Sequence, residues 1–200
     1  MRLHGFAMSP NTRRAQLTLE ESGLPYELLP VDLMSGAQKQ PDYLALNPTG
    51  RVPVLVEGDF KLWESNAIIE YIAALVPERG LGPKNPRERA ELSRWMFMNA
   101  AHLSPAQAHI FAHSIRLPED QRIPKLVENG RLEVDRCLGP LNDYLEGRDY
   151  ILDRFTIADI AISASLGMAA MLSIDLTKFA NVTAWLDRTR ARPSWKKVYG

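Results

Sequence analysis

A run of proline and glycine at residues 77–86, Pro-Glu-Arg-Gly-Leu-Gly-Pro-Lys-Asn-Pro, is the feature that most constrains how this chain can fold. Neither a helix nor a strand ladder continues through such a segment, because proline has no N–H to donate and its ring fixes φ. Residues 1–76 carry three more acidic than basic side chains, and residues 77–200 carry three more basic than acidic. We therefore predict two domains, residues 1–76 and 87–200, joined by the linker 77–86.

The first domain alternates between the periodicities of strands and helices. We predict strands at residues 2–6, 26–31, 53–57 and 60–63 and helices at 12–22 and 65–75, with a short irregular or helical piece before the third strand. Gly23 suits the end of the first helix, Gly58-Asp59 suits a tight hairpin, and Ser65 is available as N-cap of the last helix. The order β-α-β, then β-β-α, predicts an α/β domain with one parallel pair of strands.

The second domain shows no convincing strand. Helical patterns cover residues 87–114, 124–145, 156–172 and 182–191, which predicts an all-α helical bundle. The third pattern begins with a capping box, because Thr156 suits the N-cap and Asp159 stands three residues later, flanked by a Phe155–Ile160 hydrophobic staple. Apolar residues cover most of this helix, so we expect it to form the core of the bundle.

The composition excludes several classes of protein. The 24 basic and 24 acidic side chains leave no net charge, which disfavours nucleic acid as the main ligand because duplex-binding domains carry a basic excess. No stretch approaches the ~20 apolar residues of a membrane span, and the first residues lack the apolar core of a signal peptide. The lone Cys137 cannot form an internal disulfide and is interpreted as buried helix packing. We therefore expect a cytoplasmic protein without a nucleic-acid or membrane partner.

Four short motifs carry the strongest signal about function. They are Ser9-Pro10-Asn11-Thr12-Arg13-Arg14, Asn47-Pro48-Thr49-Gly50-Arg51-Val52-Pro53, Glu64-Ser65 and Phe155-Thr156-Ile157-Ala158-Asp159. In this order and spacing the chain resembles the cytosolic glutathione transferases over nearly its whole length, and among them most of all the phi class, which uses serine. The resemblance implies a thioredoxin-like first domain, a homodimer, glutathione as co-substrate, no metal, and a detoxifying transferase that acts on small hydrophobic electrophiles.

Conjugation requires the thiolate of glutathione at neutral pH, whereas an ordinary cysteine thiol has a pKa of about 8.5. Lowering that pKa by two units takes roughly 2.7 kcal/mol. A hydrogen bond from a hydroxyl to the anion supplies roughly 1.5–3 kcal/mol, and a helix N-terminus supplies roughly 0.3–1 kcal/mol. The resemblance assigns Ser9 as this catalytic donor, between the first strand and the first helix. Without the resemblance, Ser9 is interpreted as a simple cap of that helix.

The resemblance assigns the rest of glutathione to the same domain. The backbone of Val52, ahead of a cis Pro53, would pair with the cysteinyl backbone as an added strand does. Ser65 at a helix N-terminus would bind the γ-glutamyl carboxylate, and Glu64 the neighbouring ammonium. The purely structural interpretations are a proline at the start of a strand and an ordinary N-cap preceded by an exposed glutamate.

Four further charged or polar side chains belong to this domain. Lys39 is the family's match for the glycyl carboxylate, and Gln38 beside it stands where the phi class often has histidine. Arg13 and Arg14 fall in the first turn of a helix, where cations oppose the helix dipole unless an anion lies nearby. A bound thiolate or carboxylate would relieve that repulsion, and two solvated arginines are the equal alternative.

Three histidines, 102, 109 and 113, share one helical face at 3.6 residues per turn, which raises the possibility of a metal site. We disfavour it because no acidic residue falls on that face and because Pro105 is expected to kink the helix. His102 is instead expected to border the electrophile pocket.

Two other functions compete with the transferase. A non-catalytic member of the same fold could carry glutathione or a protein partner, but the intact set of site residues favours a working thiol site. A thiol–disulfide enzyme or dehydroascorbate reductase needs a reactive cysteine at the start of the first helix. This chain has Ser9-Pro10-Asn11-Thr12 there, which argues against that chemistry.

Overall fold

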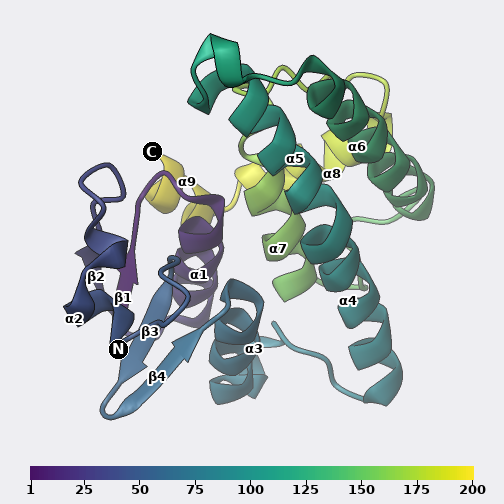
Figure 1. Cartoon of the computed structure of the whole chain (residues 1–200). Coiled ribbons are helices and arrows are strands. Elements are labelled where there is room, and N and C mark those ends of the chain that lie inside the picture. The colour runs from purple at the N-terminus through teal and green to yellow at the C-terminus, as the bar shows by residue number, and fades with distance from the viewer. The chain divides into compact units, whose positions relative to one another are not determined.

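The computed structural model describes all 200 residues, and contacts divide the chain into two compact units (Figure 1). The first unit comprises Met1–Gly82 together with Pro193–Gly200, and the second comprises Pro83–Arg192. Each unit buries its own set of apolar side chains. None of the helices has the length and apolar character needed to cross a membrane.

The first unit is built on a four-stranded mixed sheet with the strand order β2-β1-β3-β4. Its elements are β1 (Arg2–Gly5), α1 (Pro10–Ser22), β2 (Glu27–Pro30), η1 (Ala37–Lys39), α2 (Pro41–Leu44), β3 (Val54–Glu57), β4 (Phe60–Trp63), α3 (Ser65–Leu75), η2 (Pro77–Arg79) and α9 (Pro193–Tyr199). β1 is parallel to β2 and antiparallel to β3, which is antiparallel to β4. The predicted α/β fold with one parallel pair is confirmed.

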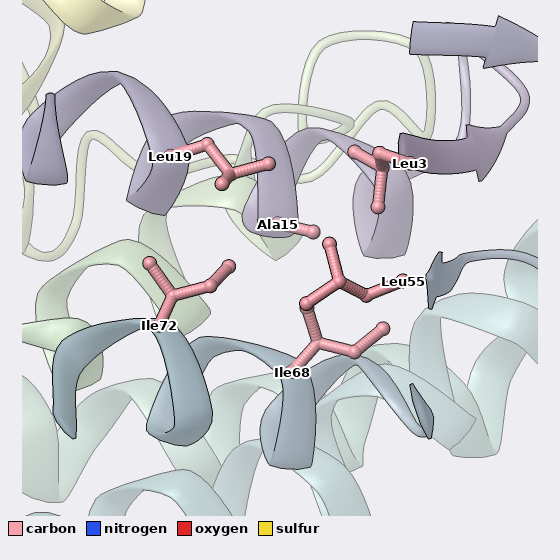
Figure 2. Packing of buried hydrophobic residues seen from close by; sticks show 6 residues of the cluster. All are labelled: Leu3, Ala15, Leu19, Leu55, Ile68 and Ile72. Carbon is pink, nitrogen blue, oxygen red and sulfur yellow. The ribbon is translucent and has the colours of Figure 1, made fainter. Parts of the chain in front are cut away.

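Side chains of the central strands alternate between the two faces of the sheet, as the strand period of two requires. Leu55 of β3 belongs to the face that α1 and α3 cover, in a fully buried cluster that Figure 2 shows: Leu3, Ala15, Leu19, Leu55, Ile68 and Ile72. Val54 and Val56 belong to the opposite face, where they pack with Val31 and with Tyr43 of α2. The sheet therefore has an apolar layer on each side.

Two helix starts differ from the prediction. α1 begins at Pro10, ahead of the predicted start at Thr12, because a proline fits the first turn of a helix and leaves Ser9 as the N-cap. The sequence favours Ser65 as N-cap of α3, whereas in the structure Glu64 is the N-cap and Ser65 is the first helical residue. The irregular piece predicted before the third strand is η1 followed by α2.

The second unit is all-helical, as predicted. Its elements are α4 (Pro86–Met98), η3 (Asn99–Leu103), α5 (Ser104–Phe111), η4 (Ala112–Arg116), η5 (Glu119–Gln121), α6 (Pro124–Tyr144), α7 (Ile157–Leu166) and α8 (Ala180–Arg190). The helix predicted at 87–114 is therefore a helical segment in which η3 and η4 are π-helical turns. η3 lies just before Pro105, whose missing N–H and bulky ring disturb the preceding turn, and the wider π turn accommodates both.

α7 is buried along its whole length and forms the core of the second unit, as expected. The carboxylate of Asp159 accepts hydrogen bonds from the N–H (2.8 Å) and the hydroxyl (3.0 Å) of Thr156 at the start of this helix. It also accepts from the N–H of Ile151 at 3.0 Å and from the indole of Trp185 at 2.9 Å. Burial raises the pKa of the Asp159 carboxyl, and these four donors oppose the shift.

α7 ends at Leu166, well before the predicted end at residue 172. Gly167 follows directly, and a glycine inside a helix costs about 1 kcal/mol relative to alanine. Beyond it, the guanidinium of Arg131 in α6 donates to the carbonyls of Leu172 (3.3 Å) and Ser173 (2.7 Å). These carbonyls are therefore satisfied without a continued helix.

α9 belongs to the first unit, although it follows the second in the sequence. It packs against α1 (Figure 1), where the Lys197 ammonium lies 2.7 Å from the Glu20 carboxylate and the Ser194 hydroxyl donates to the Glu21 carboxylate. The sequence predicts these residues to be part of the helical domain 87–200, because helical periodicity identifies an apolar face but not the surface that it covers. The boundaries 1–76, 77–86 and 87–200 stay a prediction.

Candidate active site

Four segments that carry the predicted site residues leave the sheet at one edge. In the strand register, Gly5 at the end of β1 pairs with Pro30 at the end of β2. His4 pairs with Val54 at the start of β3, and Val54 pairs with Trp63 at the end of β4. The segments after β1, β2 and β4 and the segment before β3 therefore share this edge. They hold Ser9, Gln38, Lys39, Glu64, Ser65, Val52 and Pro53.

Ser9 is the N-cap residue of α1 and is half-buried. Its N–H donates to the carbonyl of Phe6 at 2.9 Å, and its carbonyl accepts from the N–H of Arg13 at 2.9 Å. Its hydroxyl does not cap the helix and has no other partner in the chain. The hydroxyl is thus held at the positive end of the α1 dipole and remains available as a donor.

The loop that carries Ser9 is held against the first turn of α1. The hydroxyl of Thr12, which is fully buried, accepts from the N–H of Phe6 at 3.2 Å. Gly5 permits this close approach, because a Cβ at that position would lie only 2.3 Å from the Thr12 Cγ2 atom. A larger residue at position 5 would therefore displace Thr12 and the loop that it holds.

The N-terminus of α3 combines a strained residue with a buried cation. Glu64, the exposed N-cap, has φ 71° and ψ 110°, a conformation that costs a non-glycine residue of order 1–3 kcal/mol. The hydroxyl of Ser65, which is 8% exposed, accepts from Nη1 of Arg14 at 3.0 Å. The same Nη1 donates to Asn66 Oδ1 at 2.8 Å. Since the guanidinium donates to one lone pair of the Ser65 oxygen, the hydroxyl proton is left to be donated elsewhere.

Arg14 and Asn66 are the site residues that sequence reasoning did not assign. Arg14 is 3% exposed, and burial lowers its pKa to about 10, so it is a cation at neutral pH. In the sequence, Arg13 and Arg14 fall in one helical turn. This left two alternatives open: an anion bound near the two side chains, or two arginines that are simply solvated. Solvation of both is wrong, because Arg14 is buried and Arg13 is half-buried and donates from Nε to the Ala7 carbonyl at 2.8 Å.

The Val52–Pro53 peptide bond is cis, as the resemblance implies. Two side chains hold Arg51, the residue before Val52. Its carbonyl accepts from the Tyr43 hydroxyl and from Asn47 Nδ2, each at 2.8 Å. Neither the N–H nor the carbonyl of Val52 has a hydrogen-bond partner in the chain. Val52 therefore offers one backbone donor and one backbone acceptor at the sheet edge, which is what an added strand would need.

Gln38 and Lys39 lie in η1 and differ in environment. A Cβ on Gly50 would lie 3.1 Å from the Gln38 carbonyl, so the η1 segment approaches the loop before Val52. Gln38 is half-buried, and its Oε1 is buried without a hydrogen-bond partner. Lys39 is exposed, with no ion pair to an acidic side chain. An amide oxygen and an ammonium are therefore available beside the sheet edge.

The three histidines of the second unit form no metal site, and no group of three or more His, Cys, Asp or Glu side chains could hold an ion. The π turns on either side of α5 alter the helical phase from which one shared face was inferred. His102 Nδ1 lies 3.7 Å from Glu133 of α6, an acidic neighbour that the same-helix argument missed. His113 Nδ1 accepts from the N–H of Ile123 at 3.3 Å.

Cys137 is buried, as predicted, and burial raises its pKa to about 11.

Known proteins match the chain over nearly its whole length. The family model for the N-terminal domain of glutathione S-transferase matches residues 1–74, and the model for the C-terminal domain matches residues 95–193. Glutathione S-transferase F10 of Arabidopsis thaliana is 34% identical, over 94% of this chain and 91% of its own length.

Two solved structures show the same fold. Glutathione transferase F2 from Populus trichocarpa has a TM-score of 0.86 and 26% identity, covering 98% of this chain and 96% of its own. A glutathione transferase from Burkholderia graminis, solved with two glutathione molecules bound per subunit, has a TM-score of 0.89 and 28% identity. That match covers 98% of this chain and 86% of the other.

Proposed function

Because the chain belongs to the glutathione S-transferase family, we propose that it binds glutathione at the described sheet edge and activates the thiol with the Ser9 hydroxyl. Its curated relatives and both family models make it an enzyme of this type, most like the phi class. The reaction that we propose is attack of the glutathione thiolate on a small hydrophobic electrophile. No step of this reaction requires a metal.

The observation that carries the proposal is the Ser9 hydroxyl, which is held at the N-terminus of α1 without a partner in the chain. A thiolate placed there would gain one hydroxyl hydrogen bond, roughly 1.5–3 kcal/mol, and the helix dipole, roughly 0.3–1 kcal/mol. Lowering the thiol pKa by two units takes roughly 2.7 kcal/mol, so these two interactions suffice. Ser9 need not lose its proton, because the sulfur is the nucleophile.

The γ-glutamyl end of glutathione would bind at the N-terminus of α3. The γ-glutamyl carbon bears a carboxylate and an ammonium. The carboxylate would accept from the Ser65 hydroxyl and from the first N–H groups of α3, above the buried cation of Arg14. The ammonium would donate to the carboxylate of Glu64. The Arg14–Ser65 hydrogen bond supports this orientation, because it directs the Ser65 proton away from the guanidinium.

The middle and the other end of glutathione would use backbone and η1 groups. The cysteinyl residue would pair with the N–H and carbonyl of Val52 in the manner of an added strand. Lys39 would attract the glycyl carboxylate, and the neighbouring Gln38 would contact the same end of glutathione. We further propose a homodimer in the cytoplasm, since the family resemblance implies a dimer and twofold pairing is the commonest symmetry. Light scattering should give about twice the chain mass of 22.5 kDa.

The decisive experiment compares Ser9→Ala and Ser9→Thr with the parent enzyme. Thiolate absorbance of bound glutathione and the conjugation rate with an aryl halide are followed against pH. Ser9→Ala should raise the thiol pKa and slow the neutral-pH reaction by about one to two orders of magnitude, with activity returning at high pH where the thiol ionises unaided. Ser9→Thr retains a hydroxyl and should stay near the parent.

Ser35→Ala is the matched control, because its exposed hydroxyl donates to the Asp32 carbonyl at 3.0 Å and forms no hydrogen bond with Ser9. It should leave the pH profile unchanged. If Ser9→Ala also keeps the parent's profile, another group ionises the thiol and the assignment of Ser9 fails. Calorimetry of glutathione binding then separates this failure from loss of the binding site itself.

A further inference from the structure

The C-terminal helix brings an aromatic pair to the first turn of α1. In α9 the rings of Trp195 and Tyr199 are parallel, with centroids 4.0 Å apart. The guanidinium carbon of Arg13 lies 4.1 Å from the centroid of the Tyr199 ring. This is a cation–π contact between residues that are far apart in the sequence but belong to one unit of the fold.

Arg13 also holds the loop that precedes Ser9. Its Nε donates to the Ala7 carbonyl at 2.8 Å, and its Nη2 donates to the Met8 sulfur at 3.6 Å. Because a guanidinium is planar, it can present its face to a ring and its N–H edge to the loop at the same time. The side chain of Arg13 therefore links Tyr199 to the two residues immediately before the proposed thiolate donor.

We propose that Tyr199 and Arg13 are positioning residues, through which α9 holds the Ala7-Met8-Ser9 loop where the Ser9 hydroxyl can reach the thiolate. The inference rests on the proposed function for its effect on catalysis, and on the contacts alone for its effect on the loop. Thr12 anchors the loop at Phe6, and Arg13 anchors it at Ala7 and Met8. Without the ring of Tyr199, the guanidinium loses the surface that limits its motion.

The test uses the whole 200-residue chain and three variants of α9. Tyr199→Leu removes the aromatic face but keeps an apolar side chain, whereas Tyr199→Phe retains the face. Lys197→Ala is the matched control, because it breaks the ion pair with Glu20 on the same helix without touching Arg13. The readouts are hydrogen exchange of the amides of residues 6–9, the pKa of bound glutathione thiol, and kcat and KM for glutathione.

Tyr199→Leu should speed exchange in residues 6–9, raise the thiol pKa and lower kcat by about two- to fivefold with KM nearly unchanged. Tyr199→Phe should restore all three values, and Lys197→Ala should leave them near the parent. Unchanged loop exchange in Tyr199→Leu, or the same increase in Lys197→Ala, overturns the inference. If Ser9→Ala leaves the thiol pKa unchanged, the assignment of Ser9 fails separately, and loop exchange still decides the role of Tyr199.

Discussion

The backbone of Glu64 has a positive φ, which is uncommon for a residue other than glycine. Its φ of 71° would suit glycine, yet a glutamate occupies the position directly before α3. Glu64→Gly should therefore raise the free energy of unfolding by about 1 kcal/mol. The same change removes the carboxylate proposed to accept the glutathione ammonium, so affinity should fall about tenfold, equivalent to about 1.4 kcal/mol. Denaturant melts and calorimetry measure the two effects.

Glu64→Ala is the control, since it removes the same carboxylate without relieving the backbone. It should weaken glutathione binding as much as Glu64→Gly and should not gain stability. If the glycine variant is no more stable than the alanine variant, the backbone at position 64 is not strained. Equal affinity in both variants and the parent would remove Glu64 from the ammonium site.

Arg14 supplies a buried positive charge that the proposed carboxylate site needs. Arg14→Met keeps most of the side-chain length but leaves Ser65 Oγ and Asn66 Oδ1 without the donor that they have in the parent. We expect the KM for glutathione to rise about tenfold, and we expect the melting temperature to fall because these buried acceptors lose their donor. Arg14→Lys should keep the charge and lose less affinity. Arg2→Met, the same substitution at an exposed residue of β1, should change neither quantity.

The candidate site could be predicted from the sequence only where a residue acts through its own local element. Ser9 follows a strand and precedes a helix, and Ser65 opens a helix, so periodicity and the family motifs locate both. Arg14 differs, because its partner Ser65 is 51 residues away and the contact exists only once α1 and α3 pack on the same sheet face. The strain at Glu64 likewise depends on the whole turn between β4 and α3, which periodicity does not describe.

At the scale of elements, periodicity predicted the helices and strands well and their ends less well. α1 starts at Pro10 and α7 stops at Leu166, because a proline and a glycine near those ends act locally and outweigh the apolar pattern. The π turns around α5 were beyond prediction, since the sequence indicated a kink at Pro105 but not its form. The capping box of α7 was predicted in full, because both of its partners lie within one turn.

Asp159 should be the most costly single carboxylate to remove from the second unit. It is fully buried and accepts from four donors, two on Thr156, one on Ile151 and one on Trp185. Asp159→Ala leaves these donors without an acceptor, and each unsatisfied buried donor costs about 1–3 kcal/mol. We therefore expect a loss of at least about 3 kcal/mol in the free energy of unfolding, measured by denaturant melts.

Asp175→Ala is the matched control for this prediction. Its carboxylate also accepts from an N–H and a hydroxyl, those of Thr177 at 2.9 and 2.6 Å, but these bonds are exposed to solvent. Water can replace the lost acceptor, so the cost should stay below about 1 kcal/mol. Similar losses in the two variants would mean that burial of Asp159 does not set its contribution.

At the scale of the whole molecule, the chain leaves the first unit at Gly82 and returns to it at Pro193. Two tryptophans allow this division to be tested. Trp195 in α9 is 8% exposed and stacks on Tyr199 in the first unit, whereas Trp185 in α8 is fully buried in the second. The two tryptophans are only ten residues apart in the sequence, yet they belong to different units of the fold.

Either tryptophan changed to alanine should cost about 3–5 kcal/mol, as large-to-small changes at buried aromatic residues do. The two variants should differ in where the chain opens locally, because local unfolding occurs in the unit that has lost packing contacts. Hydrogen exchange should accelerate in β1 and α1 for Trp195→Ala, and in α7 and α8 for Trp185→Ala. If Trp195→Ala instead accelerates exchange in α7 and α8 while α1 stays protected, α9 contributes to the helical unit and the boundary at Pro193 is wrong.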